Sequence, residues 1–123
     1  RMSRGLRDVY KRQARMLNQA AAAILVCGDL DRAFPPAPDF WVIDAAIAAQ
    51  NMTLAANDLG IGSVWLGTWP DEKRVKRQAA IFQLPETIVP HSILALGYPA
   101  EDIDMRAVRP SRYEENRVHV NQW

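Results

Sequence analysis

Residues 40–60, FWVIDAAIAAQNMTLAANDLG, form the most strongly patterned stretch of this 123-residue chain and decide its fold. Apolar residues recur along it at helical spacing. Gly60 follows at a point where glycine can adopt the left-handed conformation that ends many helices. The sequence therefore predicts a helix over Phe40–Leu59, with Asp39 as its N-cap.

The polar residues of this helix cover too little of its surface for a helix that is exposed on one side. Asp44, Asn51 and Asp58 lie seven residues apart on one narrow stripe, and most other positions are Ala, Ile, Leu, Met or aromatic. A helix that is apolar on most sides must be buried on most sides. We therefore expect it to pack against a sheet of its own chain and against a second copy, giving a homodimer through Phe40–Leu59.

Shorter patterned segments surround this helix. They are a strand at Ala23–Cys27, a proline-rich loop at 30–38, a strand at Ser63–Leu66, a second helix from Pro70 to Leu84 and a buried strand at 91–97. Val75, Ala79 and Phe82 are the expected buried face of the second helix, because they are spaced four and three residues apart.

Composition indicates one globular domain. The chain is 49% hydrophobic and 24% charged, which excludes collagen-like, disordered and disulfide-scaffold classes. Cys27 is the single cysteine, so an internal disulfide cannot form, and a cytoplasmic setting is favoured. The longest apolar run, Ala20–Cys27, is much shorter than a bilayer span, so no membrane partner is expected.

The net charge of +1 is the sum of two unlike parts. Residues 1–15 contain six basic side chains and one acidic one, whereas the remainder contains nine basic and thirteen acidic ones. A basic head can bind nucleic acid, but this one lacks the interleaved aromatic residues that stack on bases. We therefore expect no nucleic-acid partner, a non-native or disordered head at 1–14, and a domain over 15–123.

Two features could bind a cofactor. The loop GIGSVWLG (60–67) follows a helix and precedes a strand, which is the wrong order for a dinucleotide fingerprint. Its glycines could still bring bare backbone near a flat ligand, with N–H groups around Leu66 and Gly67 donating to a ring nitrogen. In the tail, Arg109 and Arg112 could grip one phosphate. The alternatives are an ordinary helix end with a tight turn, and a solvated tail.

No side chain stands out as a catalyst. Cys27 lies in an apolar strand pattern, where a free cysteine behaves as a small hydrophobic residue. His91 and His119 are too few and too far apart in the sequence to define a metal site. A redox protein whose cofactor carries the chemistry would need no such side chain.

Three segments together resemble the C-terminal part of the FMN-dependent nitroreductase family: DAAIAAQNMTLAANDLGIGSVWLG (44–67), ALGYPAE (95–101) and RPSRYEENRVHVNQW (109–123). The resemblance implies an α+β fold of three layers, with a central, mainly antiparallel sheet flanked by helices. It also implies a homodimer that binds FMN at the subunit interface. Trp65, Leu66 and Gly67 would lie along the flavin ring with a backbone N–H near N5, and Arg109 and Arg112 would contact the phosphate.

The implied activity is ping-pong hydride transfer from NAD(P)H through FMN to a small nitroaromatic, quinone or similar acceptor. The Arg/Ser/Arg segment with which family members grip FMN is not visible in this sequence. The chain is therefore expected to be a partial domain that lacks about the first third of its parent. The alternative is a non-catalytic fragment, or a flavin-binding or dimerisation module without turnover.

Overall fold

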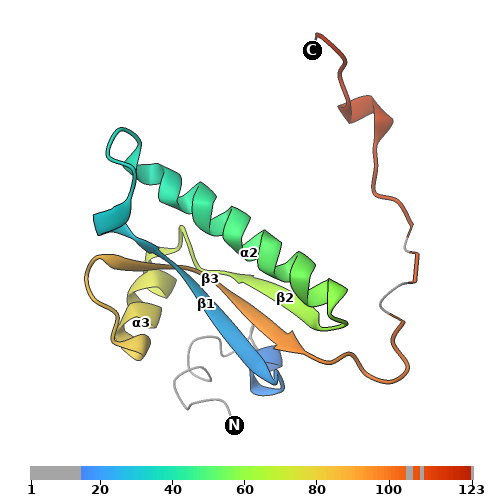
Figure 1. Cartoon of the computed structure of the whole chain (residues 1–123), viewed down its shortest axis with the longest axis horizontal. Coiled ribbons are helices and arrows are strands. Elements are labelled where there is room, and N and C mark those ends of the chain that lie inside the picture. Colours follow the sequence, from blue (N-terminus) through green and yellow to red (C-terminus); the bar gives the residue numbers. More distant parts are fainter. Residues whose placement is uncertain (1–14, 105–106, 109, 123) are drawn as a thin grey trace.

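The computed structural model describes residues 15–104, 107–108 and 110–122 as helices around a small antiparallel sheet (Figure 1). The strands are β1 (Ala22–Asp29), β2 (Gly62–Gly67) and β3 (Ile88–Gly97), in the order β1-β3-β2. The helices are α2 (Trp41–Asp58) and α3 (Glu72–Phe82). Short 3-10 turns lie at Arg15–Asn18, Leu30–Arg32, Pro38–Phe40 and Glu115–Arg117. Both predicted helices and all three predicted strands are present, with longer strands than expected.

The sheet separates two cores because β3 is apolar on both faces. Ile93 is fully buried and packs with Leu17 and Leu66 on one face, where Ile81 of α3 also lies. Leu94 is fully buried on the opposite face, in the cluster that Trp41 of α2 completes. Successive strand residues point to opposite faces, so this apolar run produces a helix–sheet–helix arrangement. The predicted three-layer α+β architecture is confirmed.

The long helix begins at Trp41, one residue later than the sequence predicts, and its cap differs. Asp39 lies within the 3-10 turn Pro38–Phe40, and the N-cap of α2 is Phe40, which makes no side-chain capping bond. The predicted Asp39 cap is therefore wrong. The N–H of Phe40 already bonds to the carbonyl of Ala37, so the chain forms a 3-10 turn before the helix starts. The predicted end is confirmed, because Gly60 has a φ of 73°.

One side of α2 covers the sheet and the opposite side remains open in the single chain. Small residues face the sheet, including Ala45 and Ala49, which are 6% and 0% exposed. On the opposite side, Ile43, Ile47 and Leu54 are more than half exposed. The expected packing of this helix against its own sheet is confirmed.

The most deeply buried residue of the second helix is polar. Asp71 caps α3, since its Oδ1 accepts from the N–H groups of Lys73 and Arg74 at 3.0 and 3.2 Å. The residue of α3 that is fully buried is Gln78, whose amide pairs with Thr68. The predicted face of Val75, Ala79 and Phe82 is partly buried. The sequence did not predict that the fully buried residue on this side is Gln78, which meets the hydroxyl of Thr68 in the turn after β2.

The C-terminal segment leaves the sheet after β3 and projects away from the body of the molecule (Figure 1). Every described residue from 100 to 122 is exposed. Among the described residues, no helix combines the length and apolarity that crossing a bilayer would need.

Candidate functional site

The last three residues of β2 present three different environments. Leu66 is buried in the core with Ile93. Trp65 pairs with Leu94 on the face that carries α2, and it is 37% exposed. Gly67 is exposed, and a Cβ built on it would meet nothing within 4 Å. The strand is therefore anchored by its leucine, with accessible backbone beside an accessible indole.

An aromatic cluster, formed by Trp41, Trp65, Trp69 and His91, lies at this end of the sheet. The ring centroids of Trp41 and Trp69 are 5.1 Å apart, and His91 lies 6.0 Å from both Trp41 and Trp65. All three pairs have edge-to-face geometry, which aromatic quadrupoles favour. The cluster therefore joins the start of α2 to the end of β2.

His91 is the ionisable member of this cluster. It is 7% exposed, and its Nδ1 lies 3.2 Å from the hydroxyl of Ser92. Burial lowers the pKa of His91 below its ordinary value, because the charged imidazolium loses hydration. The imidazole is therefore neutral near pH 7.

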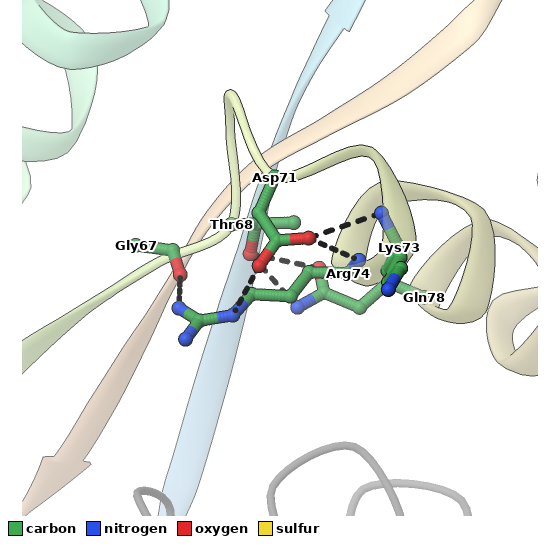
Figure 2. A network of polar contacts seen from close by, with 6 residues as sticks. All are labelled: Gly67, Thr68, Asp71, Lys73, Arg74 and Gln78. Carbon is green, nitrogen blue, oxygen red and sulfur yellow. Dashed lines mark hydrogen bonds and ion pairs between the residues drawn. The ribbon is translucent and has the colours of Figure 1, made fainter.

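A polar network connects the end of β2 to the first two turns of α3 (Figure 2). The guanidinium of Arg74 donates through Nη1 to the carbonyl of Gly67 at 3.0 Å, and its Nε lies 3.1 Å from Oδ2 of Asp71. Deeper in the molecule, the hydroxyl of Thr68 donates to Oε1 of Gln78 at 3.0 Å, and Nε2 of Gln78 donates back at 2.8 Å. The Arg74–Asp71 pair of this network is partly exposed to solvent, and the Thr68–Gln78 pair is buried.

The backbone after Gly67 is also held at several points. The N–H groups of Thr68 and Trp69 both donate to the carbonyl of His91, at 3.1 and 3.0 Å. The N–H of Asp71 donates to the carbonyl of Thr68 at 3.0 Å, which closes the turn into α3. The accessible end of β2 is therefore a fixed surface.

A separate hollow of about 590 Å³ opens between the end of β1, the loop after it and the start of α2. Its lining includes Cys27, Arg32, Trp41 and Asp44. Burial raises the pKa of the Cys27 thiol, so this cysteine is a poor nucleophile near neutral pH. Within the described part of the chain, no group of three or more His, Cys, Asp and Glu side chains could hold a metal ion.

The structure brings together only part of the predicted site. Trp65 and Gly67 are both exposed at the end of β2, and Leu66 between them is buried in the core. Arg112 is exposed in the tail, which leaves the sheet where Gly97 pairs with Gly62, at the opposite end of β2 from Gly67. Arg109 lies outside the described residues. One chain therefore does not place Arg112 beside the end of β2.

Sequence reasoning missed the residues that support this surface. The partners of Trp65 and Gly67, which are His91 and Arg74, come from a different strand and a different helix. The seven-residue spacing from Gly67 to Arg74 has no meaning until the turn between them is folded. The sequence analysis places a helix after Pro70, but it does not identify the contacts of Asp71 and Arg74 at its start.

Comparison with known proteins gives a consistent family assignment. Residues 4–98 match the nitroreductase family, and the match begins within the basic head. A Methanothermobacter thermautotrophicus protein named "Putative NADH dehydrogenase/NAD(P)H nitroreductase" is 41% identical over 108 residues, which cover 88% of this chain and 53% of that protein. The chain thus spans about half the length of this relative.

Two solved structures share the fold. A Bacteroides thetaiotaomicron protein with the same name as that relative is 36% identical, with a TM-score of 0.81 over 97% of this chain and 67% of that one. An FMN-dependent nitroreductase from Clostridium difficile is 26% identical, with a TM-score of 0.78 over 97% of this chain and 70% of that one.

Proposed function

Because the chain belongs to the nitroreductase family, we propose that it is part of a cytoplasmic FMN-dependent NAD(P)H oxidoreductase. Its acceptors would be nitroaromatics, quinones or similar small molecules, reduced by ping-pong hydride transfer. The similarity to an FMN-dependent nitroreductase of known structure supports FMN as the cofactor. The relative named as an NAD(P)H nitroreductase supports the nicotinamide donor.

One observation carries the proposal: the bare backbone of Gly67 at the open end of β2. A Cβ at this position would point into empty space, so the strand leaves room for a flat ring against the main chain. The N–H of Thr68 donates to the carbonyl of His91, so Thr68 faces β3 and the carbonyl of the preceding residue, Gly67, points away from it. The N–H and C=O groups of a strand residue lie on the same side, so the N–H of Gly67 also points toward this open edge. The residues present fit a flavin ring.

Each member of the surface would have a distinct role toward the bound cofactor. Gly67 would offer its N–H to a ring nitrogen, Leu66 would anchor the strand, and Trp65 would provide an apolar wall. The neutral imidazole of His91 would hold the Trp65 indole in place through their edge-to-face contact. FMN, when bound, supplies the hydride chemistry between NAD(P)H and the acceptor, so the chain needs no catalytic side chain of its own.

A homodimer through α2 belongs to the same proposal. The stripe Ile43, Ile47 and Leu54 is exposed on the side of α2 opposite the sheet, although such a row of aliphatic side chains is normally covered. A second copy that packs its own α2 there would bury both stripes. Arg109 and Arg112 remain our candidates for contacts with the FMN phosphate in such an assembly.

The first test measures FMN binding and turnover by the full chain. Purified protein, titrated with FMN and followed by flavin fluorescence, should bind it, and the loaded protein should oxidise NAD(P)H with a quinone as acceptor. Gly67→Val should weaken FMN binding by about tenfold or more, because its branched side chain fills the space for the ring. Ala80→Val, at an exposed site on α3, is the matched control and should bind FMN as the wild type does.

The outcomes separate the candidate functions. FMN binding without NAD(P)H oxidation would favour a flavin-binding module without turnover. No FMN binding by the wild-type chain would contradict the catalytic proposal for this polypeptide. If FMN binds but Arg112→Ala leaves its affinity unchanged, Arg112 does not contact the phosphate.

A further inference from the structure

The peptide between Gly67 and Thr68 has both its carbonyl and its N–H bonded. Both partners lie outside β2, the strand that would face the cofactor. Its carbonyl accepts from Arg74 at 3.0 Å, and its N–H donates to the carbonyl of His91 at 3.1 Å. We propose that Arg74 is a positioning residue that fixes this peptide, and that the Arg74–Asp71 ion pair sets the charge beside the flavin site. The flavin part of this inference rests on the proposed function.

Such a clamp matters at Gly67 because glycine has no side chain of its own that could orient the peptide. A glycine has wide freedom in φ and ψ, so an exposed one at a strand end is mobile unless its peptide groups are bonded. The planar guanidinium of Arg74 presents donors in a rigid fork. One donor reaches the Gly67 carbonyl while Nε faces Asp71, as Figure 2 shows.

Asp71 completes the clamp from the other side. Its Oδ2 pairs with Nε of Arg74 at 3.1 Å, and its Oδ1 accepts from the backbone N–H groups at the start of α3. The guanidinium is therefore tied to the first turn of the helix. Because α3 also packs on the sheet through Ile81, the orientation of the Gly67 peptide depends on a packed element.

The ion pair also places two opposite charges beside Gly67, the last residue of the segment proposed to face the flavin. The side chains of Arg74 and Asp71 are 37% and 46% exposed, so each charge is partly screened by solvent. Removing either side chain changes the net charge at this place by one unit, with opposite sign for Arg74 and Asp71. Reduction of FMN adds negative charge to the ring system, so its midpoint potential should report the sign of the charge that remains.

The binding arm of the experiment uses the full chain and FMN. Arg74→Met should weaken FMN affinity by about tenfold, because the Gly67 carbonyl then loses the bond that orients it and must be ordered on binding. Arg74→Lys should restore part of that loss, since one ammonium can satisfy only part of a two-point contact. Arg77→Met is the matched control: it removes the same charge from an exposed position of the same helix and should leave affinity unchanged.

A second measurement, of the FMN midpoint potential, tests whether the charges of Arg74 and Asp71 act on the flavin or whether these residues have only a structural role. Arg74→Met leaves Asp71 uncompensated and should make the FMN midpoint potential more negative. Asp71→Asn removes the negative charge beside Arg74, keeps a side chain that caps helices well, and should shift the potential the opposite way. A tenfold change in relative affinity for the two redox states corresponds to about 30 mV.

Two kinds of failure are distinguishable. If the wild type binds FMN but Arg74→Met matches Arg77→Met in affinity and potential, the role of Arg74 is overturned while the proposed function stands. Potential shifts of the same sign in Arg74→Met and Asp71→Asn would likewise overturn the charge argument. If the wild type does not bind FMN, the proposed function fails and the flavin role of Arg74 fails with it.

Discussion

His91 shows how one residue can acquire a role from its surroundings alone. In the sequence it is one of two histidines without a metal-binding pattern. In the structure its ring lies against Trp41 and Trp65 and is almost completely buried. Neither indole offers a compensating negative charge, and Ser92 offers only a hydroxyl. Protonation of this ring in the folded state is therefore unfavourable.

This environment predicts a pH-dependent stability. In the unfolded chain His91 takes up a proton near its ordinary pKa of 6.5, whereas burial lowers the pKa of the folded state below that value. Between these two values the unfolded state binds more protons, so the free energy of unfolding should fall as the pH decreases through this window. The slope for one proton cannot exceed about 1.4 kcal/mol per pH unit.

Urea unfolding of the apoprotein at a series of pH values from 7.5 downward would measure this slope. His91→Asn removes the titrating ring but keeps a polar group that can bond to Ser92. It should be less stable overall, with a flatter dependence on pH. Because His119 is present in both proteins, the difference in slope isolates His91; identical slopes would contradict the prediction.

At the scale of elements, the connection from β2 to α3 depends on a buried polar pair. Thr68 and Gln78 are 1% and 0% exposed and are joined by two hydrogen bonds. Buried polar groups are costly unless they are bonded, so this pair selects the position of α3 relative to the strand end. The Arg74–Asp71 pair lies above it, nearer to solvent.

We predict that Thr68→Val lowers the free energy of unfolding by about 1–3 kcal/mol, because Gln78 then loses this hydroxyl partner in a buried site. Urea denaturation would measure it, and a cycle with Gln78→Leu should give a coupling energy of about 0.5–3 kcal/mol. Thr53→Val is the control, since that hydroxyl donates to the carbonyl of Gln50 in an exposed bond. A Thr68→Val effect no larger than the control would show that the pair does not determine the docking of α3.

In the molecule as a whole, the described residues include large apolar side chains that stay exposed on α2 and along the tail. On α2 they form the outer stripe. In the tail they include Tyr113 and Val120, 68% and 75% exposed. A stable protein dimer typically buries about 1,600 Å² in total, and a long helix with such a stripe can supply the centre of an interface of this size.

The dimer proposal predicts that Ile47→Lys and Leu54→Lys each weaken self-association by tenfold or more, because a charge would be desolvated in an apolar interface. Sedimentation velocity over a range of concentrations would measure this change. Ala80→Lys adds the same charge at an exposed site of α3 and should leave association unchanged. A wild-type chain that is folded by circular dichroism but monomeric at all concentrations would contradict the proposal.

Local sequence patterns were enough to predict the helices, the strands and the family. The run FWVIDAAIAAQNMTLAANDLG specified the long helix and its glycine end, and alternating or continuous apolar runs specified the three strands. These patterns are local, because helix and strand periodicity depend on neighbouring residues. The missed start of α2 also has a local cause: the 3-10 turn at Pro38–Phe40 competes with capping by Asp39. The resemblance in segments 44–67 and 95–101 identified the family correctly.

The support of the end of β2 could not be predicted from sequence and depends on the folded arrangement. The contacts of His91 with Trp65, of Arg74 with Gly67 and of Gln78 with Thr68 join residues from separate elements. Their geometry depends on strand register and on the turn before α3, which no periodicity encodes. The fold also showed that one chain does not bring Arg112 to the end of β2, because antiparallel pairing sends β3 toward the opposite end of the sheet. Sequence pattern thus specified which faces are apolar, and three-dimensional packing decided which polar groups meet.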